Sequence, residues 1–284
     1  MRLVLGSAQF GMNYGILKNK KINLKELKKI KDLSVKSTIR FIDTALNYGD
    51  SESVIAKSKL NSLNVITKIQ LPKNKNINLK NWTYKEIKKS LRRLKTNKIY
   101  AVLIHNYKDL LDNRGKNYLF FLKELKKKKI VSKLGLSIYD SAEIKEIWKF
   151  WKPDIIQVPF NVIDNRIIDS EWLKTLKKFK IKIFARSIFL QGLLVSKHDN
   201  LKFSKKYKKV LERFKNWCFK NNISTIKGCL HFVKQYKKID YLIVGFNNYK
   251  HLKEIIDCYK EVQFKVPKIF SLNDLNLIDP RRWN

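Results

Sequence analysis

Short apolar runs recur through the chain and alternate with longer amphipathic segments. The runs predict eight strands, at residues 3–5, 40–43, 64–69, 99–105, 133–137, 154–158, 181–186 and 241–245. Strands that alternate with helices imply a parallel sheet. Eight such repeats in 284 residues favour a closed (β/α)8 TIM barrel, which commonly takes about 250 residues as one domain.

The segments between these runs have helical spacing of apolar residues. Helices are predicted at residues 24–35, 82–94, 118–129, 142–151, 170–179, 207–220 and 249–259. Ser141 and Ser170 are predicted N-caps, because each precedes an acid in a first helical turn. Ser51 is predicted to do the same for the helix that follows Tyr48.

No Pro/Gly/Ser-rich linker divides the sequence, so one domain is predicted over residues 1–284, with little or no hairpin before the first strand. The longest irregular connection, residues 190–206, follows the seventh strand. On a barrel it would overhang the active-site face. The tail, residues 264–284, is predicted to pack across the barrel rather than to add a strand.

Membrane insertion and secretion are not expected. The sequence has no run of about 18 apolar residues, which a membrane-spanning helix would need. The first apolar stretch is too short for a signal peptide. Cys218, Cys229 and Cys258 lack metal-ligand or redox spacing. We interpret them as free, buried thiols of a protein in the reducing cytoplasm.

The formal charge of +38 would, taken alone, suggest a nucleic-acid or anionic-surface partner. The lysines, however, occur in almost every polar segment instead of one stripe. This distribution favours solvated helix faces, so no specific nucleic-acid or membrane partner is predicted. Nucleic-acid binding stays open as an alternative, and it predicts an affinity that falls steeply with salt.

Polar residues with proton-transfer chemistry lie at three successive strand ends. Asp43 ends the second predicted strand, Lys68 the third and His105 the fourth, while Tyr48 is on the loop after Asp43. Strand ends of a barrel build its active site. Tyrosine acts as a general acid at neutral pH only if its pKa falls from about 10. An adjacent ammonium would lower it, and a carboxylate would keep that ammonium charged.

A histidine nearby can orient a carbonyl oxygen or share the proton. The four residues therefore suit proton delivery to an alkoxide, and so suit hydride addition to C=O. Each of them alone would more often have a structural role. Their occurrence together and in this order favours a reductase site.

These residues closely resemble the aldo-keto reductase superfamily. The segment Asp43-Thr44-Ala45-x-x-Tyr48-Gly49-x-Ser51-Glu52 is similar to that family's first signature. The resemblance implies Tyr48 as general acid, Asp43 and Lys68 as the pair that tunes it, and His105 as the substrate-orienting residue. It also implies a nicotinamide cofactor, usually NADPH, with NADH not excluded. The sequence has no G-x-G-x-x-G motif, so a Rossmann domain is not supported.

The resemblance continues through nearly the whole chain and implies a cofactor site. Ser137 and Gln157 match residues that hold the nicotinamide carboxamide, although Ile138 replaces an asparagine of the family pattern. Arg186 stands where an aromatic residue stacks on nicotinamide, and a planar guanidinium can also stack. The pyrophosphate would lie along Ser187, Phe189 and Gly192, and the adenosine end along Gly245, Asn247, His251 and Glu254.

Two functions follow from this pattern. The first is an NAD(P)H-dependent carbonyl reductase or alcohol dehydrogenase that acts on a small molecule, possibly sugar-derived. The second is a cofactor-binding barrel with a sensor or scaffold role and little turnover. Substrate choice depends on the βα loops and the tail. The basic charge suggests anionic carbonyl substrates.

Overall fold

Eight parallel strands close into a barrel in chain order. The computed structural model describes residues 2–16, 21–196, 204–272 and 274–283. Pairing of β1 with β8 closes the ring, and the predicted (β/α)8 fold is confirmed. The strands are β1 (Leu3–Gly6), β2 (Phe41–Asp43), β3 (Asn64–Ile69), β4 (Ile99–Ile104), β5 (Val131–Ser137), β6 (Ile155–Pro159), β7 (Lys182–Arg186) and β8 (Tyr241–Val244).

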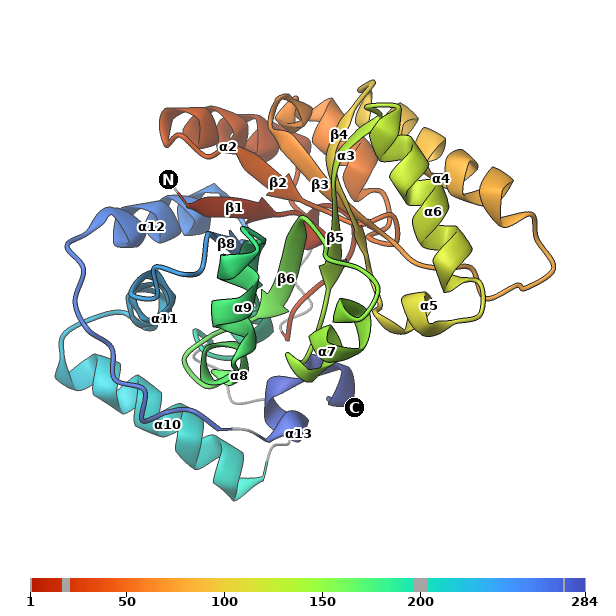
Figure 1. The fold of residues 1–284 in the computed structure, drawn as a ribbon. Helices are drawn as coiled ribbons and strands as arrows, with labels where there is room; N and C mark the ends of the chain where they lie inside the picture. Colours follow the sequence, from red (N-terminus) through yellow and green to blue (C-terminus); the bar gives the residue numbers. More distant parts are fainter. Residues whose placement is uncertain (1, 17–20, 197–203, 273, 284) are drawn as a thin grey trace.

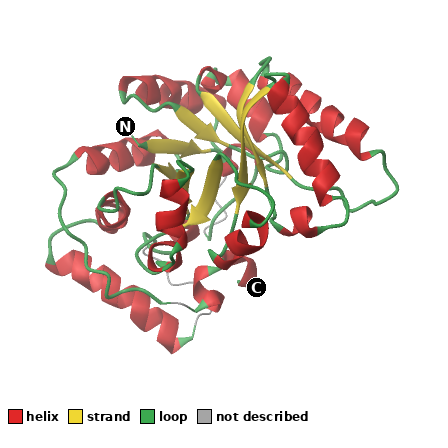
Figure 2. Cartoon of the chain, viewed as in Figure 1, coloured by secondary structure: helices red, strands yellow, loops and turns green. Residues whose placement is uncertain are grey.

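Helices surround the strands on the outside of the barrel (Figures 1 and 2). Each predicted helix overlaps an observed one. The α-helices are α1 (Ala8–Gly11), α2 (Leu24–Lys36), α3 (Ser51–Lys57), α4 (Leu79–Leu94), α5 (Lys108–Leu111), α6 (Gly115–Lys127), α7 (Ala142–Trp148), α8 (Arg166–Asp169), α9 (Trp172–Lys178), α10 (Lys205–Lys220), α11 (Thr225–Lys234), α12 (Tyr249–Lys260) and α13 (Leu275–Ile278). Three 3-10 turns complete the described elements: η1 (Leu60–Ser62), η2 (Leu190–Gly192) and η3 (Pro280–Arg282).

Two apolar clusters form the core. The larger one lies between the sheet and its helices. The smaller one fills the barrel interior and contains Val4, Phe41, Ile66, Ala101, Leu103, Ile155, Phe184 and Ile243. Because successive side chains of a strand point to opposite faces, the residue two positions after such an interior residue also points inward. The interior core thus forms a floor, and the next inward layer lies above it.

Of the three predicted N-caps, Ser141 holds the N-cap position of α7, and the other two are wrong. Ser141 precedes α7 but makes no capping hydrogen bond, and Ser170 precedes the actual N-cap of α9, Glu171. Ser51 is the first residue of α3, and its buried Oγ lies 2.8 Å from Ser7 Oγ. Local acid spacing misled at Ser51 because its Oγ bonds Ser7, and at Ser170 because its Oγ donates to Ile167 O instead. Side chains that do cap helices include Asn23, Asn78, Ser224 and Asn248.

The C-terminal tail packs against the barrel and adds no described strand, as predicted. It forms α13 and η3, and Figure 1 shows α13 close to the end of the chain. Leu272 N donates to Ile163 O at 2.9 Å, and Leu277 and Ile278 are buried. Of the predicted loop at residues 190–206, η2 is described, whereas 197–203 lie outside the described residues.

Within the described part of the chain, no helix is long and apolar enough to cross a membrane. Cys218, Cys229 and Cys258 are buried free thiols, as the sequence suggested. Their burial raises the pKa of each thiol, so they are poor nucleophiles at neutral pH.

Candidate active site

A cavity of about 400 Å³ opens where the eight strands end. Its wall includes a residue within two positions of the end of every strand: Gly6, Asp43, Lys68, His105, Ser137, Gln157, Arg186 and Gly245. All fourteen residues predicted from the sequence line this one cavity. Besides those at the strand ends, they are Tyr48, Ser187, Phe189, Gly192, Asn247, His251 and Glu254.

Strand alternation explains why the three predicted strand-end residues converge. Phe41, Ile66 and Leu103 belong to the interior floor. Asp43, Lys68 and His105 each follow one of them by two positions, so they point to the same side. They form the layer directly above the apolar floor and face the cavity.

A buried ion pair lies at the base of the cavity. Lys68 Nζ is 2.6 Å from Asp43 Oδ2, and only 2% of the lysine side chain and 7% of the aspartate side chain are exposed. Lys68 Nζ also donates to Thr44 O at 2.9 Å. Gln157 Nε2 donates to the other carboxylate oxygen, Asp43 Oδ1, at 2.7 Å. Both oxygens of Asp43 are therefore engaged, which fixes the carboxylate and the ammonium.

Tyr48 lies beside this pair and beside His105. Lys68 Nζ is 5.3 Å from the centroid of the Tyr48 ring. The Tyr48 and His105 rings meet edge to face, with centroids 6.2 Å apart and planes at 77°. The phenol, the ammonium and the imidazole thus share one wall of the cavity.

The pKa of Tyr48 differs from the prediction. Burial raises it, and the Asp43 carboxylate raises it further, whereas the Arg186 cation lowers it. The expectation that Lys68 lowers this pKa is therefore wrong. The ammonium is paired with Asp43, so its charge is balanced, and desolvation of the phenolate dominates.

His105 is a neutral imidazole at physiological pH. Burial, helped by the Lys68 and Arg186 charges, lowers its pKa from 6.5 to about 3. Burial also lowers the pKa of Lys68, and Asp43 opposes that effect. A neutral imidazole can donate one hydrogen bond and accept another. It can therefore orient a carbonyl oxygen without adding charge.

The Tyr48 loop is held by two glycines in close contact. Gly49 has a φ of +58°, and a Cβ there would collide with Gly11 O. A Cβ on Gly11 would in turn collide with Tyr48 O and approach the backbone of Ser51. Larger residues would separate the two segments, so this contact sets the position of the phenol.

Arg186 is anchored at the mouth of the cavity. Its Nη2 donates to Ile138 O at 2.9 Å, and its Nη1 donates to Ser187 Oγ at 3.2 Å. Its guanidinium carbon lies 4.1 Å from the centroid of the Tyr139 ring. Ile138, which replaces the expected asparagine, has a buried side chain and contributes its carbonyl group instead.

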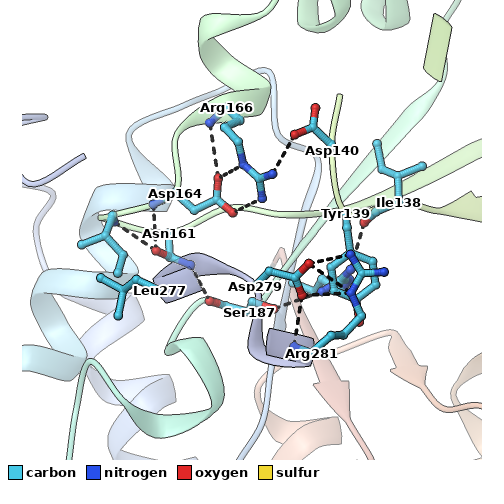
Figure 3. Close-up of polar contacts among 12 residues, drawn as sticks. Ile138, Tyr139, Asp140, Asn161, Asp164, Arg166, Ser187, Leu277, Asp279 and Arg281 are labelled. Carbon is cyan, nitrogen blue, oxygen red and sulfur yellow. Dashed lines mark hydrogen bonds and ion pairs between the residues drawn. The ribbon is translucent and has the colours of Figure 1, made fainter. Parts of the chain in front are cut away.

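A polar network ties the surrounding loops together (Figure 3). Arg166 pairs with the buried Asp164 at 2.8 Å and with Asp140 at 2.8 Å. These contacts join the loop before α8 to the loop after β5. Asn161 Nδ2 donates to Ser187 O at 3.0 Å, and this bond joins the loop after β7 to the loop before α8. The rim of the cavity is therefore cross-linked on this side.

The cavity wall fits a nicotinamide group. Gln157 Oε1 is buried and has no hydrogen-bond partner among the described residues, while Nε2 is fixed on Asp43. A buried acceptor left open in this way suits a primary amide such as the nicotinamide carboxamide. At Gly192, with a φ of +95°, a Cβ would have only Ile16 nearby, at 3.7 Å, so the backbone there is open to a ligand.

The predicted adenosine end lies at the start of α12. Asn248 caps this helix by accepting from His251 N at 2.8 Å. Asn247 N donates to His251 Nδ1 at 3.4 Å, and burial lowers the pKa of His251, so this imidazole is neutral. The ring lies 6.4 Å from that of Phe189, across the cavity wall.

Two wall residues, and a tail residue that contacts one of them, were missed from the sequence. Tyr14 lines the cavity with Tyr48, and desolvation together with that neighbour raises its pKa. The strand-end rule could have found it, since it lies on the connection after β1. Tyr139 follows β5 in the same way. Arg281, which stacks on Tyr139, comes from the tail, and no sequence signal pointed to it.

Comparisons with known proteins agree with this geometry. The family model described as "Aldo/keto reductase family" matches residues 2–275. A comparison with curated proteins gives no match. Among solved structures, the aldo-keto reductase AKR11C1 from Bacillus halodurans in its holo form has a TM-score of 0.74 at 16% identity, covering 93% of this chain and 88% of its own. PA4992 from Pseudomonas aeruginosa has a TM-score of 0.66 at 18% identity, covering 91% and 88%.

Proposed function

Because this chain belongs to the aldo/keto reductase family, we propose that it reduces an aldehyde or ketone to an alcohol, with the proton supplied by Tyr48. The observation that carries the proposal is the buried Asp43–Lys68 pair beneath Tyr48 and His105 in one cavity. A phenol, an ammonium, a carboxylate and an imidazole group meet in this cavity, and no structural role accounts for all four together.

NADPH is the proposed cofactor, with NADH as the alternative. Ser137 and Gln157 would hold the carboxamide, and the face of Arg186 would lie against the ring. A nicotinamide bound there would supply the hydride. The pyrophosphate would follow Ser187, Phe189 and Gly192, and the adenosine end would meet Gly245, Asn247, His251 and Glu254.

His105 and Tyr48 would bind the carbonyl oxygen. The neutral imidazole donates a hydrogen bond that orients the oxygen, and the phenol donates a second one. As the carbonyl carbon becomes tetrahedral, negative charge develops on that oxygen. Tyr48 then gives up its proton to that oxygen, and the phenolate that remains lies beside the Lys68–Asp43 pair.

The raised pKa of Tyr48 bears on direction. It keeps the phenol protonated at neutral pH, which is the form that reduction needs. An alkoxide is a far stronger base than a phenolate, so proton transfer stays downhill. Oxidation would need the phenolate first, and burial opposes it. Reduction is therefore the proposed direction at neutral pH.

Tyr48→Phe tests the mechanism. The variant should lose turnover by about 10²- to 10⁴-fold, while the Kd for NADPH in a fluorescence titration stays within about threefold, because the phenol is not a proposed cofactor contact. Tyr100→Phe is the matched control, since Tyr100 packs on Phe41 at the barrel floor. Unchanged turnover in Tyr48→Phe would exclude the mechanism. A parallel titration with NADH would decide the cofactor.

A second candidate is a cofactor-binding barrel with a sensor or scaffold role. It is favoured by the altered nicotinamide surroundings, where Ile138 and Arg186 replace the residues of the family pattern. Tight NADPH binding with no reaction across a broad panel of carbonyls and alcohols would support this candidate. Turnover of any of these carbonyls or alcohols at a kcat typical of enzymes would exclude this second candidate.

A further inference from the structure

Arg186 is a cavity cation without a carboxylate partner in the described part of the chain. Among the described residues, two Lys or Arg side chains line the cavity, Lys68 and Arg186. Lys68 is paired with Asp43. Arg186 instead donates to two neutral acceptors, Ile138 O and Ser187 Oγ. A guanidinium carries five N–H donors, so three of them have no protein acceptor among the described residues.

Tyr139 is sandwiched between two guanidinium groups. Arg281 Cζ lies 3.4 Å from the Tyr139 ring centroid, and Arg186 Cζ lies 4.1 Å from it. The closer group is already in van der Waals contact with the ring. A second guanidinium with its Cζ 4.1 Å from the centroid on the same face would overlap the first. The two groups therefore lie on opposite faces of the Tyr139 ring. The tail and β7 are thereby joined through one aromatic ring.

Asp279 holds the outer guanidinium in place. This buried carboxylate accepts from Arg281 Nε at 2.9 Å (Figure 3). Asp164, the other acid that feels the Arg186 charge, is paired with Arg166. Asp164 and Asp279 thus each have their own arginine, and no ion pair to Arg186 is present among the described residues.

Arg186 lies at the catalytic end of the cavity. Its charge lowers the pKa of both Tyr48 and His105, which places the cation within electrostatic reach of the proposed reacting atoms. An anionic group on a substrate held by those residues could therefore reach it. The planar face of Arg186 and its N–H edge are different surfaces, so stacking on a cofactor ring leaves the edge available.

We propose that Arg186 binds a carboxylate or phosphate group of the substrate, and that Tyr139 and Arg281 are positioning residues that hold its guanidinium. The substrate class is then an anionic aldehyde or ketone. The inference rests on the proposed carbonyl reduction. It adds a specificity-determining residue, and it gives the tail a role in substrate choice.

The test compares kcat/KM for 4-carboxybenzaldehyde and the neutral 4-nitrobenzaldehyde. Wild type should prefer the anionic substrate by about tenfold or more, since hydrogen bonds to charged groups have this strength. Arg186→Gln should abolish the preference, so that the ratio of kcat/KM for the two substrates falls to about one, mainly through the KM of the anionic substrate. No preference in wild type would overturn the inference and leave carbonyl reduction intact.

The tail contributes through Tyr139, so substitutions there should change selectivity by different amounts. Arg281→Gln and Tyr139→Leu should each reduce the anionic preference about threefold or more, and Tyr139→Phe should keep it because the ring remains. Arg282→Gln is the matched control: the side chain of this exposed neighbour bonds only Asn276 Oδ1, at 3.4 Å, among the described residues. Equal selectivity in Arg281→Gln and Arg282→Gln would refute the positioning role.

Calorimetry with benzoate separates substrate binding from cofactor binding. At saturating NADPH, wild type should bind benzoate, and Arg186→Gln should bind it at least tenfold more weakly. If Arg186→Gln loses NADPH and not benzoate, the cation serves the cofactor phosphates and the inference is wrong. If benzoate binds through Arg186 but no carbonyl reacts, the anion site stands and the proposed function fails.

Discussion

Asp43→Asn removes one partner of the buried ion pair and leaves the Lys68 ammonium without its counter-ion. Breaking a buried pair in this way costs about 3–5 kcal/mol of unfolding free energy. For a chain of 284 residues that corresponds to a fall in Tm of about 5–8 °C. The upper part of the range applies here, because both side chains are almost fully buried and Gln157 also loses its carboxylate acceptor.

The loss should depend on pH. Burial already lowers the pKa of Lys68, and Asp43 opposes it, so Asp43→Asn lowers the pKa further. Below the unfolded value of about 10.4, the unfolded variant then binds more protons than the folded one, and its stability rises with pH. The difference in unfolding free energy between the variant and wild type should therefore decrease from pH 7 to pH 9, by up to about 1.4 kcal/mol per pH unit.

Urea denaturation at both pH values measures this gap. Asp50→Asn is the matched control, because Asp50 is on the same loop and its ion pair with Lys21 is half exposed, 49% and 55%. Exposed pairs contribute about 0–1 kcal/mol, so this variant should stay near wild type at both pH values. If Asp43→Asn unfolds at the same urea concentration as Asp50→Asn, the buried pair does not stabilise the fold and the reasoning is refuted.

Further predictions concern His105 and Gln157 in the cavity wall and Gly135 in β5. The His105 imidazole, whose pKa burial lowers to about 3, should show no change in its NMR shifts between pH 5 and pH 8; a midpoint near the ordinary 6.5 would contradict its burial. Its depressed pKa should also make unfolding easier as pH falls below about 6.5, since the unfolded state then binds the extra proton. Gln157→Leu should raise the Kd for NADPH about tenfold, in the range of a lost hydrogen bond, and an unchanged Kd in a fluorescence titration would show that Oε1 is not a cofactor contact. Gly135→Ala should destabilise the fold by about 1–3 kcal/mol, because its Cβ would collide with Leu103 and Ile155; urea denaturation checks it, and wild-type stability would mean that the strands can separate there.

The sequence was sufficient for the barrel and for the catalytic end of the cavity. Asp43, Lys68 and His105 follow apolar strand residues by a fixed alternation, so their convergence depends only on local spacing and on closure of the ring. Such a pattern can be recognised in the amino-acid sequence alone.

Other parts depend on contacts that have no local signature. Helix α11 was missed because residues 228–233 are all buried, so no polar face marks its period. Tyr139 and Arg281 meet only when the tail folds back over the barrel. The pKa of Tyr48 was predicted in the wrong direction, because burial is set by the whole cavity wall and not by the neighbours that the motif names.

The hydrogen bond from Gln157 to Asp43 has a consequence for how this protein can change. It joins β6 to β2, which are four strands apart in a ring of eight and so face one another across the barrel. The bond acts as a tie across the base of the cavity, independent of the loops above it. Exchange of the tail, or of loops other than those that hold Tyr48, should therefore alter which molecule is accepted while the proton donor stays in place. The architecture separates a fixed chemical module from an interchangeable recognition module, and protein engineers could exploit that division.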